Sequence, residues 1–208
     1  MAKALLGSTL EDLRGGVGNL VVRMRNGRTI IGQKPVYRKQ FSPKQKVTSA
    51  RFKQAGNAWM ALSYEEGLAW NAAAKGLATT GHTYFMRLAA KFLQVNPDEA
   101  PPNTPPLARF MGDTVFYSMA AVPGGIEFSA TGTNTPPSCT ELLIEKLASI
   151  HRKPSQRWQS AGFVSFTVEN LTATLELDPG PYATATRFVD SATGQMTPWQ
   201  WGERVVVG

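Results

Sequence analysis

The stretch Leu177-Asp178-Pro179-Gly180-Pro181-Tyr182 leads directly into the run ATATRFVD at residues 183–190. The Pro-Gly pair indicates a tight turn, because proline presets its φ angle and glycine accepts positive φ. After Tyr182 the residues alternate over more than the usual strand length, which predicts a long β-strand that ends at Asp190. A strand of this kind needs partners, so we expect further strands on either side of it.

The rest of the C-terminal half has the same character. Its other candidate strands are separated by turns rich in Gly, Pro, Asn and Thr, and their spacing predicts a β-sandwich. One further segment, Thr140–Ile150, is ambiguous, because its composition favours a helix while its place in the sequence suits a third strand; we expect a strand. The other candidate strands are Val115–Ala121, Ile126–Thr131, Phe163–Val168, Thr172–Leu177 and Arg204–Val207.

The corner at Leu177–Tyr182 resembles the E–F corner of immunoglobulin-like sandwiches, and the segment is similar to a fibronectin type III domain. The resemblance makes Tyr182 the corner tyrosine, with a buried ring and a hydroxyl bonded to the backbone. Phe188, the turn 191–197 and Trp199 would belong to the last hairpin. The chain has one cysteine, Cys139, so it lacks both an intrachain disulfide and the Cys…Trp…Cys pattern of antibody domains.

The N-terminal half carries most of the positive charge. Residues 1–100 hold 15 Lys and Arg against 6 Asp and Glu, whereas residues 101–208 hold 7 against 9. From Gly15 to Tyr64 there are ten cations and no acid. Like charges at this density repel one another, so we expect a negative partner to lie against this segment, either nucleic acid or an acidic protein surface.

This basic segment begins with a predicted β-hairpin. Leu20–Arg25 and Arg28–Gly32 are β-rich and flank Asn26-Gly27, a pair that favours a two-residue hairpin turn. The hairpin would gather arginines near its tip, and a connector punctuated by Pro35 and Pro43 adds more cations. The predicted partner-binding residues are Arg14, Arg23, Arg25, Arg28, Lys34, Arg38, Lys39, Lys44 and Lys46.

Three helical segments follow, at 44–62, 64–75 and 82–93, with Ser63 and Glu66 in a capping-box pattern before the second. We expect Trp59 and Trp70 to be structural core residues. The run from Ala58 to Lys75 also resembles the middle of an HMG box, but it lacks that module's apolar wedge and basic tail. Five prolines in 96–106 predict a stiff linker. The predicted organisation is therefore α+β: a basic hairpin and three-helix unit at 1–95, the linker at 96–106, and an immunoglobulin-like sandwich at 107–208.

No catalytic, cofactor or metal pattern stands out in the sequence. Glu65 and Glu66 are explained by a helix start, and Asp178 and Asp190 by turns. Cys139 follows Pro136-Pro137 and is expected in a loop. No stretch approaches the ~20 apolar residues of a membrane span, and the first residues do not fit a signal peptide. We therefore expect a non-enzymatic protein, made in the cytoplasm, without a cofactor.

The order of these features resembles that of uncharacterised structural proteins of tailed phages and prophages: Gly15–Asn19, Asn26–Thr29, Phe52–Trp70, a Pro-rich linker and Tyr182–Trp199. The resemblance implies a virion component of the capsid, head or tail, which docks through its basic region and presents an immunoglobulin-like domain in a symmetric assembly. Its partners would be other virion proteins with acidic surfaces. The alternative is a nucleic-acid-binding protein that uses residues 15–53, and a third, an adhesion module that uses Trp199 and Trp201 on carbohydrate.

Overall fold

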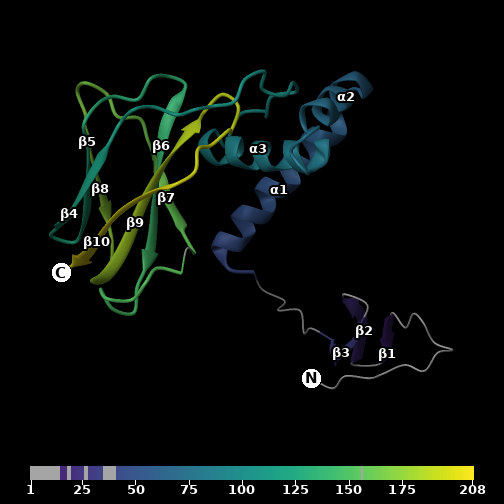
Figure 1. Cartoon of the computed structure of the whole chain (residues 1–208), viewed down its shortest axis with the longest axis horizontal. Helices are drawn as coiled ribbons and strands as arrows, with labels where there is room; N and C mark the ends of the chain where they lie inside the picture. The colour runs from purple at the N-terminus through teal and green to yellow at the C-terminus, as the bar shows by residue number, and fades with distance from the viewer. Residues whose placement is uncertain (1–14, 18–19, 26–27, 35–40, 156) are drawn as a thin grey trace. The chain divides into compact units, whose positions relative to one another are not determined.

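A computed structural model describes residues 15–17, 20–25, 28–34, 41–155 and 157–208. The chain divides into two compact units, residues 1–46 and 47–208, which are considered separately. The first holds a small sheet. The second holds the larger part of the first helix, the other two helices and two further sheets. The fold class is α+β, as the sequence predicts, with antiparallel pairing throughout the described strands (Figure 1).

The small sheet of the first unit has three strands in the order β1-β2-β3: Gly15–Val17, Leu20–Arg25 and Arg28–Gln33. β2 and β3 pair antiparallel with Arg25 opposite Arg28, so the predicted hairpin pairing is confirmed. Its predicted tip, Asn26-Gly27, lies outside the described residues. Val22 is buried within this sheet.

Each helix starts at a residue that caps its free N–H groups. Ser42 and Gln45 bond each other's backbone N–H at the start of α1 (Pro43–Ala61), where Pro43 occupies the first turn. Ser63 and Glu66 form the predicted capping box of α2 (Tyr64–Ala73). Thr80 accepts from the N–H of Thr83 at the start of α3 (Gly81–Val95).

The helices pack around aromatic side chains. Trp70 and Phe85 are buried and meet edge to face with ring centroids 5.1 Å apart, and Trp59 packs on Phe85 at 5.4 Å. Leu88, Phe92 and Leu93 continue this core along α3. The indole of Trp70 donates to the carbonyl oxygen of Asn103, which ties the Pro-rich segment to α2 at 2.7 Å.

Residues 117–207 form two antiparallel sheets. One has the strand order β4-β5-β8 and the other β10-β9-β6-β7. Most of the strands predicted near these positions are confirmed, including the ambiguous one, which is β6 and ends four residues earlier than predicted. The prediction of a strand at Phe163–Val168 is wrong in its bounds, because β7 overlaps it only at Phe163 and Val164. The bounds are β4 Tyr117–Val122, β5 Gly125–Ala130, β6 Ser138–Lys146, β7 Gln159–Val164, β8 Thr172–Glu176, β9 Gly180–Asp190 and β10 Gln200–Val207.

The two sheets share one hydrophobic core. Ile126 and Phe128 from β5 pack with Leu142 from β6 and with Tyr182 from β9. Phe166, in the connection after β7, is fully buried in the same cluster. β6 is buried from Ser138 to Leu143 without alternation, which shows that both of its faces are covered. Cys139 is therefore a buried strand residue, and the expectation of a loop there is wrong.

The second face of the four-stranded sheet is covered at one end by α3 (Figure 1). Gly194, in the turn after β9, has φ +74°, and a Cβ there would overlap the carbonyl oxygen of Leu88 on α3. Just beyond α3, the side chain of Asn96 donates to the carbonyl oxygen of Ser191 at 2.7 Å. These contacts hold the helices against the sheet, although residues 96–106 separate the two parts in sequence. The division at 1–95, 96–106 and 107–208 stays a prediction.

Candidate docking surface on α1 and α3

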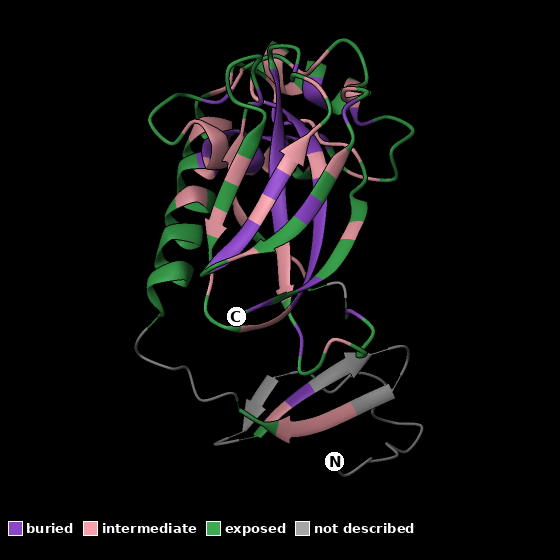
Figure 2. Cartoon of the chain, turned by 90° about the vertical axis from the view of Figure 1, so that its left-hand side faces the viewer, coloured by how far each residue is buried: buried purple, intermediate pink, exposed green. Residues whose placement is uncertain are grey.

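Helix α1 is largely exposed over its 19 residues: Ala55 is buried, and Arg51, Gly56, Ala58 and Trp59 are half-buried (Figure 2, the long green helix). The helix contains no acid and carries Lys44, Lys46, Arg51 and Lys53. Three of its large apolar side chains also face solvent, with Val47 53%, Phe52 51% and Met60 82% exposed. A helix with so little buried surface gains little from packing against its own chain, and such faces commonly contact a partner.

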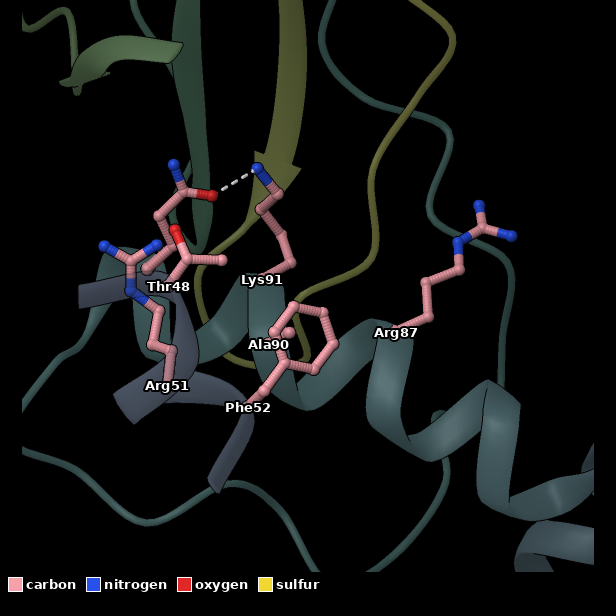
Figure 3. A pocket seen from close by; sticks show the side chains of 7 residues that line it. Thr48, Arg51, Phe52, Arg87, Ala90 and Lys91 are labelled. Atoms are coloured by element: carbon pink, nitrogen blue, oxygen red, sulfur yellow. Dashed lines mark hydrogen bonds between the residues drawn. The ribbon is translucent and has the colours of Figure 1, made fainter. Parts of the chain in front are cut away.

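Within the second unit, α1 and α3 border an open groove of about 280 Å³ (Figure 3). Its lining includes three cations and one aromatic ring, and no acid. In the view of Figure 3, the ring of Phe52 lies between the side chains of Arg51 and Arg87. The lining residues are Thr48, Arg51, Phe52, Arg87, Ala90, Lys91 and Gln94.

Lys91 connects this groove to the sheet beneath it. Its ammonium lies 2.9 Å from Oε1 of Glu141 on β6 and donates to Oε1 of Gln94 at 2.7 Å. The other oxygen of Glu141 accepts from Nε of Arg187 on β9 at 2.6 Å. Glu141 and Arg187 are direct partners in the β6–β9 register, so their side chains share the face on which α3 lies.

The electrostatics of this cluster follow from burial and pairing. Burial raises the pKa of Glu141, but the hydrogen bond from Arg187 and the charge of Lys91 outweigh it, so the net direction is down. Burial lowers the pKa of Lys91, and Glu141 opposes that effect. Two cations, Lys91 and Arg187, therefore pair with one carboxylate, a net charge of +1, and Arg51 and Arg87 add further positive charge to the groove lining.

This arrangement suits recognition of an anion better than proton transfer. The carboxylate of Glu141 is buried and its two oxygens already accept from cations, so it is poorly placed as a general base. The thiol of Cys139 is buried, which raises its pKa to about 11 and disfavours the nucleophilic thiolate. An exposed ring with an arginine on either side offers apolar contact, and each guanidinium can bind a carboxylate through two hydrogen bonds.

The predicted partner-binding residues fall in three groups. Lys34, Lys44 and Lys46 are exposed, the last two on the first turn of α1. The backbones of Arg23, Arg25 and Arg28 belong to β2 and β3, while their side chains lie outside what the structure describes. The remaining ones, Arg14, Arg38 and Lys39, are outside the described residues altogether.

The residues predicted to be structural are also placed. Trp70, Tyr182 and Phe188 are buried, Trp59 is half-buried, and Trp199 is 38% exposed. The hydroxyl of Tyr182 donates to the carbonyl oxygen of Asp178 at 2.9 Å.

Sequence reasoning missed the cluster under the groove. Lys91 stands on the apolar face of α3 with Leu88 and Phe92, and a lysine at that spacing indicates a buried partner. Glu141 interrupts the apolar run of β6 in the same way. Nothing in the sequence indicated that these two residues, fifty apart, would meet.

Other classes of site find little support in the described part of the chain. No three His, Cys, Asp or Glu side chains gather there closely enough to hold a metal ion. None of the helices among those residues has the length and apolar character to span a membrane. Comparison with known proteins finds no family model and no curated protein that matches this chain.

Proposed function

We propose that this chain is a non-enzymatic structural protein of a tailed phage or prophage particle. It docks on an acidic surface of another capsid, head or tail protein through its basic N-terminal region and the groove between α1 and α3. Its two-sheet region faces outward or packs against neighbouring subunits. The assignment to a virion rests on the order of sequence motifs from Gly15 to Trp199.

One observation carries the docking role. An acid-free helix, α1, leaves all but one of its residues at least partly exposed, and Phe52 stands between the cations of the groove. A monomeric protein seldom leaves such a helix unpartnered, and charge complementarity selects an acidic protein face with an apolar residue at its centre. The contact would weaken as salt rises, because exposed charges are screened over about 10 Å at 0.1 M salt.

The two sheets support an immunoglobulin-like or fibronectin type III identity for residues 107–208. With β4, β5, β6, β7, β8, β9 and β10 taken as strands A, B, C, C′, E, F and G, one sheet is A-B-E and the other G-F-C-C′. Immunoglobulin-like domains divide these strands between their sheets in this way. The bond from Tyr182 to Asp178, four residues upstream, has the form of a tyrosine corner. Such domains serve widely as binding modules, which suits a protein displayed on a particle.

The test is incorporation into particles. Mass spectrometry of purified particles from cells that carry this coding sequence should find the wild-type chain. The double variant Arg51→Glu, Arg87→Glu should be strongly depleted from particles, because it changes the charge of the groove by four. The control, Lys75→Glu with a second exposed reversal at Arg109→Glu, makes the same change elsewhere and should be incorporated normally. Particles without the wild-type chain, or normal uptake of the groove variant, would overturn the proposal.

The alternative is a nucleic-acid-binding protein that uses residues 15–53, and the ten cations without an acid from Gly15 to Tyr64 favour it. Its affinity for duplex DNA should then fall steeply with salt, with a log–log slope of roughly 0.9 per phosphate contacted. A filter-binding measurement on the full chain decides this. Replacement of Arg23, Arg25 and Arg28 by Ala should reduce the slope, and no retention of DNA at low salt would exclude this function.

A further inference from the structure

Three tryptophans gather on the part of the four-stranded sheet's outer face that α3 leaves uncovered. Trp201 on β10 is the register partner of Ala185 on β9, on the same side as Glu141 and Arg187 by strand alternation. The ring of Trp158, just before β7, lies 5.3 Å from that of Trp201 and 6.1 Å from that of Trp199. Trp199 is 38% and Trp201 53% exposed, so both present ring surface to solvent.

This cluster is an open surface rather than a closed core. The indole Nε1 of Trp158 is buried, and no described group accepts its hydrogen. Buried donors in closed protein cores nearly always have an acceptor, so the unpaired Nε1 of Trp158 is unusual for a core residue. The small side chains of Ala183 and Ala185 on β9 leave room for the rings to lie against the sheet. The platform of Trp158, Trp199 and Trp201 is therefore a place where a flat ligand could lie against aromatic rings.

A basic segment borders this platform. Residues 146–168 contain Lys146, Arg152, Lys153 and Arg157 and no acid, although residues 101–208 as a whole are net negative. The three in the loop before β7 are exposed: Arg152, Lys153 and Arg157. Arg204 on β10 donates to the carbonyl oxygen of Ile150 at 3.2 Å, which holds this loop beside the tryptophan-bearing strand.

The two acids nearby do not cancel this charge. Glu145 accepts from the N–H groups of Ser155 and Arg157, at 2.8 and 3.2 Å, and from the hydroxyl of Ser155, so its carboxylate is engaged in shaping the loop. Glu203, on β10, is exposed beside Arg204. Four cations (Arg152, Lys153, Arg157 and Arg204) thus stand against two acids around the platform, whereas Lys146 lies over the ring of Tyr182 on the other face of the sheet.

We propose that this platform and its basic border form a binding site for single-stranded nucleic acid, separate from the docking surface on α1 and α3. Exposed aromatic rings beside a cationic groove are what non-specific single-strand binding requires: bases stack on the rings and phosphates follow the cations. Trp199 and Trp201 stack bases, while Arg152, Lys153 and Arg157 bind phosphates. The cations beside the rings favour this ligand over a neutral glycan, which gains nothing from the charge.

The experiment is fluorescence anisotropy of the full chain with a labelled oligothymidylate of about 20 nucleotides, titrated at several salt concentrations. Trp201→Ala should raise the dissociation constant about tenfold, the typical effect of losing one stacking ring, whereas Trp201→Phe should keep most of the affinity. The double variant Arg152→Ala, Lys153→Ala should weaken binding and reduce the log–log salt slope by roughly 0.7 for each phosphate that the variant no longer binds.

The controls separate this site from other surfaces. Tyr64→Ala removes an aromatic ring that is even more exposed than that of Trp201, and Lys75→Ala removes an exposed cation. Both residues are far from the platform in sequence, and neither variant should change the affinity. Because Arg152 and Lys153 are exposed, their double variant should fold even where a tryptophan variant does not.

Two results would overturn the proposal. One is no anisotropy change with the wild-type chain at the lowest salt. The other is binding that survives both platform variants and disappears when Arg23, Arg25 and Arg28 are replaced by Ala, which would assign the strand to the N-terminal segment. Retention of a neutral polysaccharide through Trp201, with no oligonucleotide bound, falls under the first result and identifies the platform as a glycan site.

Discussion

The ammonium of Lys91 on α3 lies 2.9 Å from Oε1 of Glu141 on β6, and both side chains are more than nine-tenths buried. Arg187 on β9 binds the second oxygen of the same carboxylate. The ring of Phe163, 5.3 Å from the ammonium, covers the other side of Lys91. The helix and the sheet are therefore joined by a buried charge cluster that links α3 to β6 and β9.

Removal of the shared carboxylate should destabilise the second unit. Glu141→Ala leaves the ammonium of Lys91 buried without a counter-charge, and losing one partner of a buried pair typically costs about 3–5 kcal/mol. We expect a loss of that size in the free energy of unfolding, measured by urea denaturation. The control is Glu169→Ala, an exposed acid, which should stay within about 0.5 kcal/mol of wild type. Equal effects in the two variants would contradict the structural role of the cluster.

The same cluster should make stability depend on pH. The pKa of Glu141 is lowered in the folded state, so its contribution to stability is present above the pKa of the unfolded chain and is lost as pH falls through the lower folded value. We expect the free energy of unfolding to fall between about pH 5 and pH 2. Glu141→Gln should have a shallower acid limb, since it has no proton to take up. An acid limb identical in wild type and variant would assign the loss to other carboxylates.

Local signals in the sequence predicted most of the secondary structure. The Ser63–Glu66 box, the Asn26-Gly27 pair and the Leu177–Tyr182 turn each act through neighbouring residues, so each predicts structure from a short stretch alone. Cys139 shows the limit of this reasoning. Its prolines indicate a loop, but pairing with β9 places it in a strand, because Cys139 and Val189 are register partners. Such pairing depends on residues fifty positions away.

The candidate surfaces were much harder to predict for the same reason. The basic character of α1 was visible in the sequence, whereas its groove with Arg87 and Lys91 depends on how α1 packs against α3. Trp199 is predicted to be structural, but it stands just before the edge strand β10 and is 38% exposed. The rings of Trp158, just before β7, and Trp201, on β10, meet although β6 and β9 lie between these two edge strands in the sheet. No local sequence pattern indicates this contact.

Gly194 should be the glycine least tolerant of substitution between α3 and the sheet. Its φ of +74° disfavours any side chain, and the Cβ of alanine would also overlap the carbonyl oxygen of Leu88. Gly124 has nearly the same φ, +76°, but open space around it, so it isolates the conformational effect. We expect Gly124→Ala to cost about 1–2 kcal/mol and Gly194→Ala clearly more, measured by thermal unfolding. Equal costs would mean that the turn moves away from α3 freely.

The hydroxyl of Tyr182 should contribute modestly and its ring strongly. Tyr182→Phe removes the bond to the carbonyl oxygen of Asp178, a typical net loss of about 0.5–1.5 kcal/mol. Because Asp178 is exposed, water can replace the lost donor, and we expect a value in the lower half of that range. Tyr182→Ala also empties space beside Val205 and Val207 in the core, where loss of a large aromatic ring costs about 3–5 kcal/mol. Tyr64→Phe, at an 82% exposed position, is the control and should be neutral. Urea denaturation of the three variants separates the two contributions: a Tyr182→Phe loss as large as that of Tyr182→Ala would mean that the hydroxyl, rather than the ring, holds the corner between β8 and β9.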